Sequence, residues 1–324
     1  MTSPPPVGVL LATTTAPERI APLAAQAERS GFAQVWVAED YFFYSGFSSA
    51  ALALAATTEV TVGLGIVSAV ARHPAVTAME VATLARAHPG RFQVGIGHGL
   101  PAWVAQMGLT PRSPLRALEE CVCGVRRLLD GETVDGAGAE FRFESISLTH
   151  PPTAPVPLLT GVLGPRSLEL SGRIADGTVV SVLAGTAYLG EVRQQVGRAA
   201  GDYLLPTFAL FSIDRDGAAA RAAVRPMLAF YLAALGAPNP LTEPYGYNTA
   251  LADMLDRGGA DLVAKEMPDA WIDELAVAGD PDDVAGRIAA LGAAGATSVV
   301  LSPVDADHAD AQLATFADTV LRNL

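Results

Sequence analysis

Two neighbouring acids, Glu39 and Asp40, are the first residues in the chain whose type and position suggest chemistry. They follow directly after an apolar run, Gln34–Ala38, that has the length and composition of a buried strand. The carboxyl end of a barrel strand is where α/β barrels build their active sites. Glu39 and Asp40 are therefore candidates for a general acid or base, or for orienting a cofactor. The alternative is that they are solvated acids that cap a turn or a helix.

Aromatic side chains follow the two acids. Tyr41-Phe42-Phe43-Tyr44 is a run of four in a protein with only 6% aromatic residues, and such a run in a loop requires burial or a ligand. It therefore favours a pocket. Tyr41, Phe43 and Trp103 are our candidates for contact with a substrate.

A glycine-rich segment from Gly95 to Ala102 ends another predicted strand. From Gly97 it matches G-x-G-x-x-A, a dinucleotide fingerprint. That fingerprint requires a helix that opens at the glycines and an acid at the end of the next strand. Pro101 interrupts the segment, and the next acids lie inside an amphipathic helix, so we do not expect NAD bound in a Rossmann fold. The glycines still allow a planar ligand to approach the backbone closely.

His98 lies at the end of the same strand and is a candidate catalytic residue, with a structural histidine as the alternative. Gly164-Pro165-Arg166-Ser167 opens a predicted helix, and the free N–H groups of a helix N-terminus bind phosphate. Ser181, at the end of a later strand, would add a hydroxyl group. A simple turn is the alternative for the Gly-Pro pair. No spacing in the sequence predicts a metal site, and no Gly-x-Ser-x-Gly elbow supports triad hydrolysis.

Alternating strands and helices must position these residues. The predicted strands are Val7–Ala12, Gln34–Ala38, Val60–Gly65, Arg91–Ile96, Val156–Thr160, Gly177–Val182, Thr207–Ser212 and Ser298–Leu301. Amphipathic helices are predicted over about 16–30, 47–57, 74–87 and 113–130. Repeated β–α units imply parallel strands with right-handed crossovers, and eight of them favour a (β/α)8 TIM barrel over an open sheet.

Residues 1–324 are expected to form one such barrel domain. Two stretches do not fit its repeat: about 131–155, with a hairpin around Phe141–Phe143, and about 236–268, which is rich in Gly, Pro, Tyr and Asn. We expect both to be insertions on βα loops that shape a substrate pocket.

Composition excludes several classes of function. The formal charge of −13 repels phosphate backbones and anionic lipid, so we expect neither nucleic-acid nor membrane binding. Cys121 and Cys123 point to different sides of a predicted helix, and we interpret both as small buried core residues in a cytoplasmic protein without disulfides. Met1–Pro6 has no signal-peptide pattern, and no apolar stretch of membrane-spanning length lacks polar breaks.

Several motifs together resemble the luciferase-like family, most closely its F420-dependent branch, which includes methylenetetrahydromethanopterin reductases. The residues that carry the resemblance are Gly31-Phe32, Val35-Trp36-Val37-Ala38-Glu39, Val62-Gly63-Leu64-Gly65-Ile66, Arg72-His73-Pro74-Ala75, Pro89-Gly90-Arg91-Phe92, Gly95-Ile96-Gly97, Gly164-Pro165-Arg166-Ser167-Leu168-Glu169-Leu170, Ala175-Asp176-Gly177 and Ala278-Gly279-Asp280-Pro281. Each motif is short, but their order and spacing are specific.

The resemblance implies roles for these residues. Gly65-Ile66 matches a non-prolyl cis peptide bond that forms a bulge behind the cofactor ring. Glu39 matches an acid near that ring, and Gly97, His98 and Gly99 match the segment beside it. Gly164, Pro165, Arg166 and Ser181 match the site of the cofactor phosphate. The resemblance also implies a homodimer.

This sequence departs from the family pattern in ways that bear on function. Many F420-dependent relatives have Asp-His where this chain has Glu39-Asp40. Asp40 or His98 would then supply the proton instead, or the substrate needs none from the protein. Leu100 replaces a carboxylate of the sugar-phosphate branch, and Lys265 is the only lysine, which argues against a sugar-phosphate substrate.

We therefore expect an F420-dependent oxidoreductase that transfers a hydride between the reduced deazaflavin and a small uncharged organic molecule. An FMN-dependent monooxygenase of the same superfamily, using O2, is the alternative. Two further hypotheses are a non-catalytic barrel subunit and a cofactor-free hydrolase or lyase that uses Glu39 and Asp40.

Overall fold

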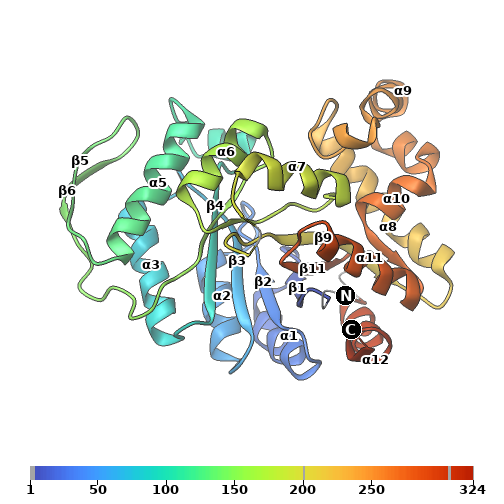
Figure 1. Cartoon of the computed structure of the whole chain (residues 1–324), viewed down its shortest axis with the longest axis horizontal. Helices are drawn as coiled ribbons and strands as arrows, with labels where there is room; N and C mark the ends of the chain where they lie inside the picture. Colours follow the sequence, from blue (N-terminus) through green and yellow to red (C-terminus); the bar gives the residue numbers. More distant parts are fainter. Residues whose placement is uncertain (1–3, 200, 306–307, 324) are drawn as a thin grey trace.

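Parallel strands in the centre and helices around them form the protein (Figure 1). A computed structural model describes residues 4–199, 201–305 and 308–323. The strands are β1 Val7–Leu11, β2 Gln34–Val37, β3 Thr61–Ser68, β4 Phe92–Gly97, β5 Val134–Ala137, β6 Arg142–Ile146, β7 Leu158–Gly161, β8 Gly177–Thr178, β9 Pro206–Ile213, β10 Val277–Gly279 and β11 Ser298–Pro303. All eight predicted strands are therefore present.

Helices follow most of the strands. They are α1 Pro17–Arg29, α2 Gly46–Ala55, α3 Pro74–Ala87, α4 Pro101–Gln106, α5 Pro114–Leu129, α6 Pro165–Ile174, α7 Thr186–Val196, α8 Gly217–Leu235, α9 Asn248–Glu266, α10 Asp269–Leu275, α11 Pro281–Ala293 and α12 Ala309–Thr319, with short 3₁₀ turns η1 Glu243–Tyr245 and η2 Leu321–Asn323. Proline occupies the first position of six of them, where its missing N–H costs nothing.

The strands close into a barrel. Their order along the sheet is β10-β9-β11-β1-β2-β3-β4-β7-β8, with every pair parallel. Backbone hydrogen bonds join the β8 segment to the β9 segment: the Thr178 N–H donates to Leu204 O over 2.8 Å, and the Phe208 N–H donates to Val180 O over 2.9 Å. The predicted parallel barrel is thus confirmed, with β10 as an additional strand beside the last residues of β9.

Large and small residues alternate inside the barrel. Trp36 of β2 is fully buried, and its ring meets Phe208 of β9 edge-on with centroids 5.3 Å apart. A Cβ atom on Gly63 of the neighbouring strand would lie only 2.3 Å from the Trp36 ring. The indole therefore requires glycine beside it, and its N–H is satisfied by Gln34 Oε1 at 2.8 Å.

The first insertion is the predicted hairpin, and it packs on α5. β5 and β6 pair antiparallel, and the Phe143 ring lies against Gly124 of α5. Glu120 accepts hydrogen bonds from three successive backbone N–H groups in the turn, at 139–141. The hairpin lies at the opposite end of the molecule from α8, α9 and α10 (Figure 1).

The second insertion is mostly helical. It contains η1 and α9, whose backbone kinks at Gly259 with φ +63°. Tyr245 and Tyr247 stack in series on Trp271 of α10, with centroids 5.3 and 4.6 Å apart. The tyrosines of this insertion are thus engaged with one another rather than spread around the barrel mouth.

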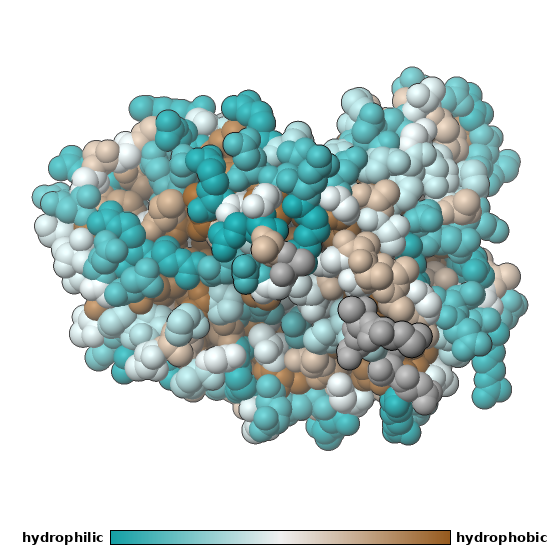
Figure 2. Space-filling model, viewed as in Figure 1, coloured by the Kyte–Doolittle hydropathy of each residue, from teal (hydrophilic) through white to brown (hydrophobic). Residues whose placement is uncertain are grey.

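Helix α8 is long and apolar enough, by length and composition alone, to cross a membrane. It behaves as a barrel helix in this fold: Val224, Leu228 and Leu232 are buried in the core. Arg221 and Arg225 form ion pairs with Asp273 and Asp269. On the face shown in Figure 2, hydrophilic residues predominate, and apolar residues show mainly in the gaps between surface elements.

Two smaller expectations have different outcomes. Cys121 is buried, as predicted, but the prediction is wrong for Cys123, which is exposed. The two residues are two positions apart on α5, so only the first faces the core. Of the segment Met1–Pro6, residues 1–3 lie outside the described part of the chain.

Candidate active site

The carboxyl ends of the parallel strands bring most of the predicted site residues to one end of the barrel. Glu39 and Asp40 follow β2, Gly65 and Ile66 lie in β3, and Gly97 ends β4. Gly164 follows β7, and Ser181 follows β8. Since all strands point the same way, these residues share the barrel mouth.

The peptide bond between Gly65 and Ile66 is cis. The pairing of β3 with β4 slips here, between Leu64 and Val67, so the strand bulges. Ile66 is only partly buried. The structure thus has the cis bond and bulge that the family resemblance implies. A second non-prolyl cis bond, Tyr41-Phe42, was not predicted.

Glu39 is buried and fully engaged. Its two oxygens accept hydrogen bonds from both terminal nitrogens of Arg72, at 2.6 and 2.7 Å. The Gly46 N–H donates to Oε2 at 3.0 Å and the Tyr41 hydroxyl to Oε1 at 3.2 Å. These contacts suit a positioning role, in which Glu39 ties the β2–α2 loop to the β3–α3 loop, rather than proton transfer.

Arg72 is the residue that sequence reasoning did not assign. It also lies 3.2 Å from Glu80 of α3 and over the Phe47 ring of α2, 5.3 Å from its centroid. The next residue, His73, caps α3 through Nδ1, which accepts from the Ala75 N–H, and its Nε2 lies 2.9 Å from Arg142 O in the hairpin. The family resemblance included Arg72-His73-Pro74, and this was the sequence signal that could have identified Arg72 as a site residue.

Asp40 has a different environment from its neighbour. Burial raises the pKa of its carboxyl group above the ordinary value, and a hydrogen bond with the Thr13 side chain opposes this only in part. Tyr44 and Tyr231 are close enough for the Asp40 charge to raise their pKa values further, beyond the effect of burial. Asp40 is thus a partly buried carboxyl group at the mouth with a pKa above its ordinary value.

His98 links β4 to the beginning of α6. Its Nε2 lies 3.1 Å from the Ser167 hydroxyl oxygen, and burial lowers the pKa of the imidazole. A neutral imidazole beside the first turn of α6 is therefore favoured. His98 is brought together with the predicted phosphate segment, 69 residues away in the chain.

The N-terminus of α6 is open. Gly164 is the N-cap without a side-chain cap, Pro165 begins the helix, and Arg166 is exposed. A Cβ atom on Gly164 would meet nothing within 4 Å. Ser181 is partly exposed. Free space and the positive end of a helix dipole together suit an anionic group.

Apolar side chains surround the acids. The Tyr41 and Trp103 rings meet edge-on with centroids 6.2 Å apart. Phe42, Phe43 and Leu100 expose 69%, 55% and 53% of their surface, an unusual amount for such residues. The predicted aromatic run is thus divided: its tyrosines are partly buried and its phenylalanines project outward.

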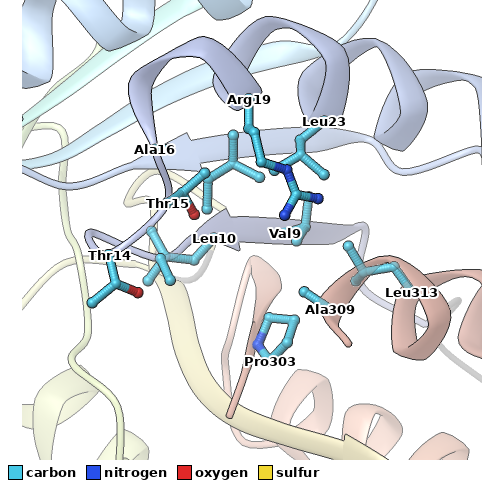
Figure 3. A pocket seen from close by; sticks show the side chains of 12 residues that line it. Val9, Leu10, Thr14, Thr15, Ala16, Arg19, Leu23, Pro303, Ala309 and Leu313 are labelled. Carbon is cyan, nitrogen blue, oxygen red and sulfur yellow. The ribbon is translucent and has the colours of Figure 1, made fainter. Parts of the chain in front are cut away.

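A cavity of about 220 Å³ lies elsewhere, outside the barrel between α1 and α12 (Figure 3). Among the residues that the structure describes, its lining includes Thr14, Thr15, Arg19 and Leu313 but no acid or histidine. Arg19 is already paired with Asp310 at 2.9 Å. None of the predicted site residues lines this cavity. Within the described residues, no group of three His, Cys, Asp or Glu side chains could hold a metal ion.

The barrel, its cis bulge and the open helix N-terminus are accompanied by a match to a family model. Residues 1–298 match the luciferase-like monooxygenase family, and the chain belongs to that family.

Its relatives include 5,10-methylenetetrahydromethanopterin reductases. The chain is 30% identical over 303 residues to the one from Archaeoglobus fulgidus, covering 87% of this chain and 88% of the relative, and 29% identical over 300 residues to that from Methanolobus tindarius, covering 88% and 90%. The solved structure of the coenzyme F420-dependent tetrahydromethanopterin reductase from Methanopyrus kandleri superposes with a TM-score of 0.85 at 25% identity, covering 99% of both chains.

We predict that Glu39→Gln destabilises the protein far more than Glu80→Gln. Removing Glu39 leaves Arg72, whose side chain is only 21% exposed, without its bidentate partner, and breaking such a pair costs about 3 kcal/mol. Glu80 makes one contact with Arg72, so its loss should cost about 1 kcal/mol. Urea unfolding of both variants measures the difference, and equal losses would contradict the assigned role of Glu39.

Proposed function

We propose that this protein is an F420-dependent oxidoreductase that transfers a hydride between the reduced deazaflavin and a small uncharged organic substrate. The observation that carries the proposal is the bulge of β3 between Leu64 and Val67 in the barrel mouth. The relatives named as reductases and the F420-dependent solved structure support the same reaction class.

The residues at the mouth fit such a cofactor. Beside the ring we place Glu39, Gly65, Ile66, Gly97, His98 and Gly99, and around the phosphate Gly164, Pro165, Arg166 and Ser181. The fit rests on two glycines. Gly97 has no side chain to project from β4 beside Ile66, and Gly164 leaves the N-terminus of α6 accessible. When bound, F420 supplies the hydride chemistry, and the protein contributes orientation and electrostatics.

Proton supply falls to Asp40. Glu39 has its hydrogen-bonding capacity filled by Arg72, Tyr41 and Gly46. His98 is held near Ser167, on the side of the phosphate segment. Asp40 is the remaining acid at the mouth, partly buried and with a raised pKa, and would deliver the proton to the substrate from its carboxyl group.

The apolar rim sets the substrate class. Tyr41, Phe43 and Trp103, with the exposed Phe42 and Leu100, would contact an uncharged organic molecule. Sugar phosphates do not suit this rim, since Leu100 offers neither charge nor a hydrogen bond.

We further propose that residues 1–324 act as one domain in a soluble, cytoplasmic homodimer that binds neither nucleic acid nor membranes. Leu52 of α2 and Val76 and Met79 of α3 support the dimer, because all three are exposed on helices that flank β3. The charge of −13 supports the absence of polyanionic partners.

Cofactor titration tests the main proposal. The purified protein should bind F420 with a dissociation constant well below that for FMN, as measured by fluorescence. A clear preference for FMN would instead support the O2-using monooxygenase. Binding of neither would support a non-catalytic barrel or a cofactor-free enzyme.

Gly164→Asp should weaken F420 binding by roughly 10- to 100-fold, because a carboxylate would face the cofactor phosphate at short range. Gly164→Asn is the matched control: it has the same size without the charge and should retain affinity. Both residues are good N-caps and meet open space, so neither variant should lose thermal stability. Equal loss of affinity in both variants would contradict a phosphate at this position.

Asp40→Asn tests the raised pKa directly. The folded protein favours the protonated carboxyl group, so Asp40 stabilises the fold at low pH, and this contribution is lost as pH rises from the ordinary value of 3.8 through the raised pKa. Wild type should therefore lose stability relative to Asp40→Asn over that range. Urea unfolding at a series of pH values measures the difference, and a constant difference would show that the pKa is not raised.

A further inference from the structure

Three glycines on two neighbouring strands surround the Ile66 side chain. Gly95 and Gly97 lie two residues apart on β4 and so face the same side, and Gly97 is paired with Gly161 of β7. Cβ atoms built on Gly95, Gly97 and Gly161 would lie 2.7, 2.3 and 2.5 Å from side-chain atoms of Ile66. We call these three residues the glycine seat.

None of these positions tolerates a side chain while Ile66 stays where it is. Contacts below 3.0 Å between carbon atoms require something to move, and the partner here is a β-branched side chain with restricted rotamers. Since the core side of Ile66 is closed by β4 and β7, the free direction is toward the barrel mouth. A methyl group in the glycine seat would therefore raise Ile66 into the mouth.

We propose that the glycine seat positions the Ile66 side chain and thereby sets the depth at which the cofactor ring lies. This inference rests on the proposed function, because it assigns Gly95 and Gly161, which touch only Ile66 and barrel residues, as positioning residues for the ring. Hydride transfer depends on a separation of about 3–3.5 Å between the reacting atoms, and an error of about 1 Å costs roughly 100-fold. The rate of hydride transfer therefore depends on how deep the ring lies in the barrel mouth.

Gly161 offers the cleanest test among the three. The nearest atoms to its Cβ position all belong to Ile66, whereas a Cβ on Gly97 would also lie 2.6 Å from the Gly161 carbonyl oxygen. Gly161→Ala should therefore displace Ile66 with little damage to the strands. Ile66→Ala removes the atoms that collide and is the compensating change.

The experiment is a double-mutant cycle on F420 affinity, read by fluorescence titration. Gly161→Ala should weaken binding about tenfold, and Gly161→Ala with Ile66→Ala should bind at least as well as Ile66→Ala alone. The matched control is Gly8→Ala on β1, where the added Cβ lies 2.9 Å from Gln34 and far from the Ile66 contacts. Gly8→Ala should lower stability without altering F420 affinity, and adding Ile66→Ala should not restore that stability.

The proposal would be overturned if Gly161→Ala folds and binds F420 with wild-type affinity. It would also be overturned if the loss of affinity in the double variant equals the sum of the losses in the two single variants, expressed as free energies. The crystal structure of Gly161→Ala gives a second readout that needs no cofactor: Ile66 should be displaced toward the mouth, and an unmoved Ile66 would also overturn it. If wild type binds no F420, the proposed function fails, and the crystal readout still decides whether the seat positions Ile66.

Discussion

The bidentate ion pair between Arg72 and Glu39 is the interaction on which the mouth of the barrel depends. A guanidinium and a carboxylate with so little exposure are stable only when every donor and acceptor has a partner. Here the partners come from three elements: Tyr41 from the β2–α2 loop, Gly46 from the first turn of α2, and Glu80 from α3. The pair therefore fixes the loop that carries Asp40 and the aromatic rim.

The same pair connects the rim to the hairpin. His73, next to Arg72, caps α3 and contacts Arg142 O, and its ring meets Phe143 edge-on with centroids 5.0 Å apart. Phe143 in turn packs on Gly124 of α5. A continuous set of packed side chains thus joins the first insertion to the site, so the insertion supports the site from outside rather than lining it.

Much of the fold could be predicted from the sequence, because buried parallel strands are short apolar runs bounded by helix signals. The predicted helix 74–87 coincides with α3 since Pro74 starts it. The prediction for β3 stopped at Gly65, whereas the strand continues to Ser68 beyond the bulge. Helix α9 was not predicted, because the Gly258-Gly259 pair is typical of a helix end. The helix bends at Gly259 instead of ending there.

The site was harder to predict, because its interactions join residues far apart in the chain. Arg72 and Glu39 are separated by 33 residues and His98 and Ser167 by 69, and no local pattern encodes either contact. The Gly65-Ile66 cis bond was foreseen only through the family resemblance, and the burial of Cys123 was predicted wrongly because the α5 face was misjudged.

Two adjacent carboxyl groups therefore have different surroundings. Glu39 accepts hydrogen bonds from a guanidinium and two further donors. Burial instead raises the pKa of Asp40, and the hydrogen bond with the Thr13 side chain opposes this only in part. Different surroundings can in this way give two similar residues different roles, which are positioning for Glu39 and the proposed proton transfer for Asp40. At the second position of the Asp-His pattern, this chain thus has a carboxyl group with a raised pKa in place of the imidazole.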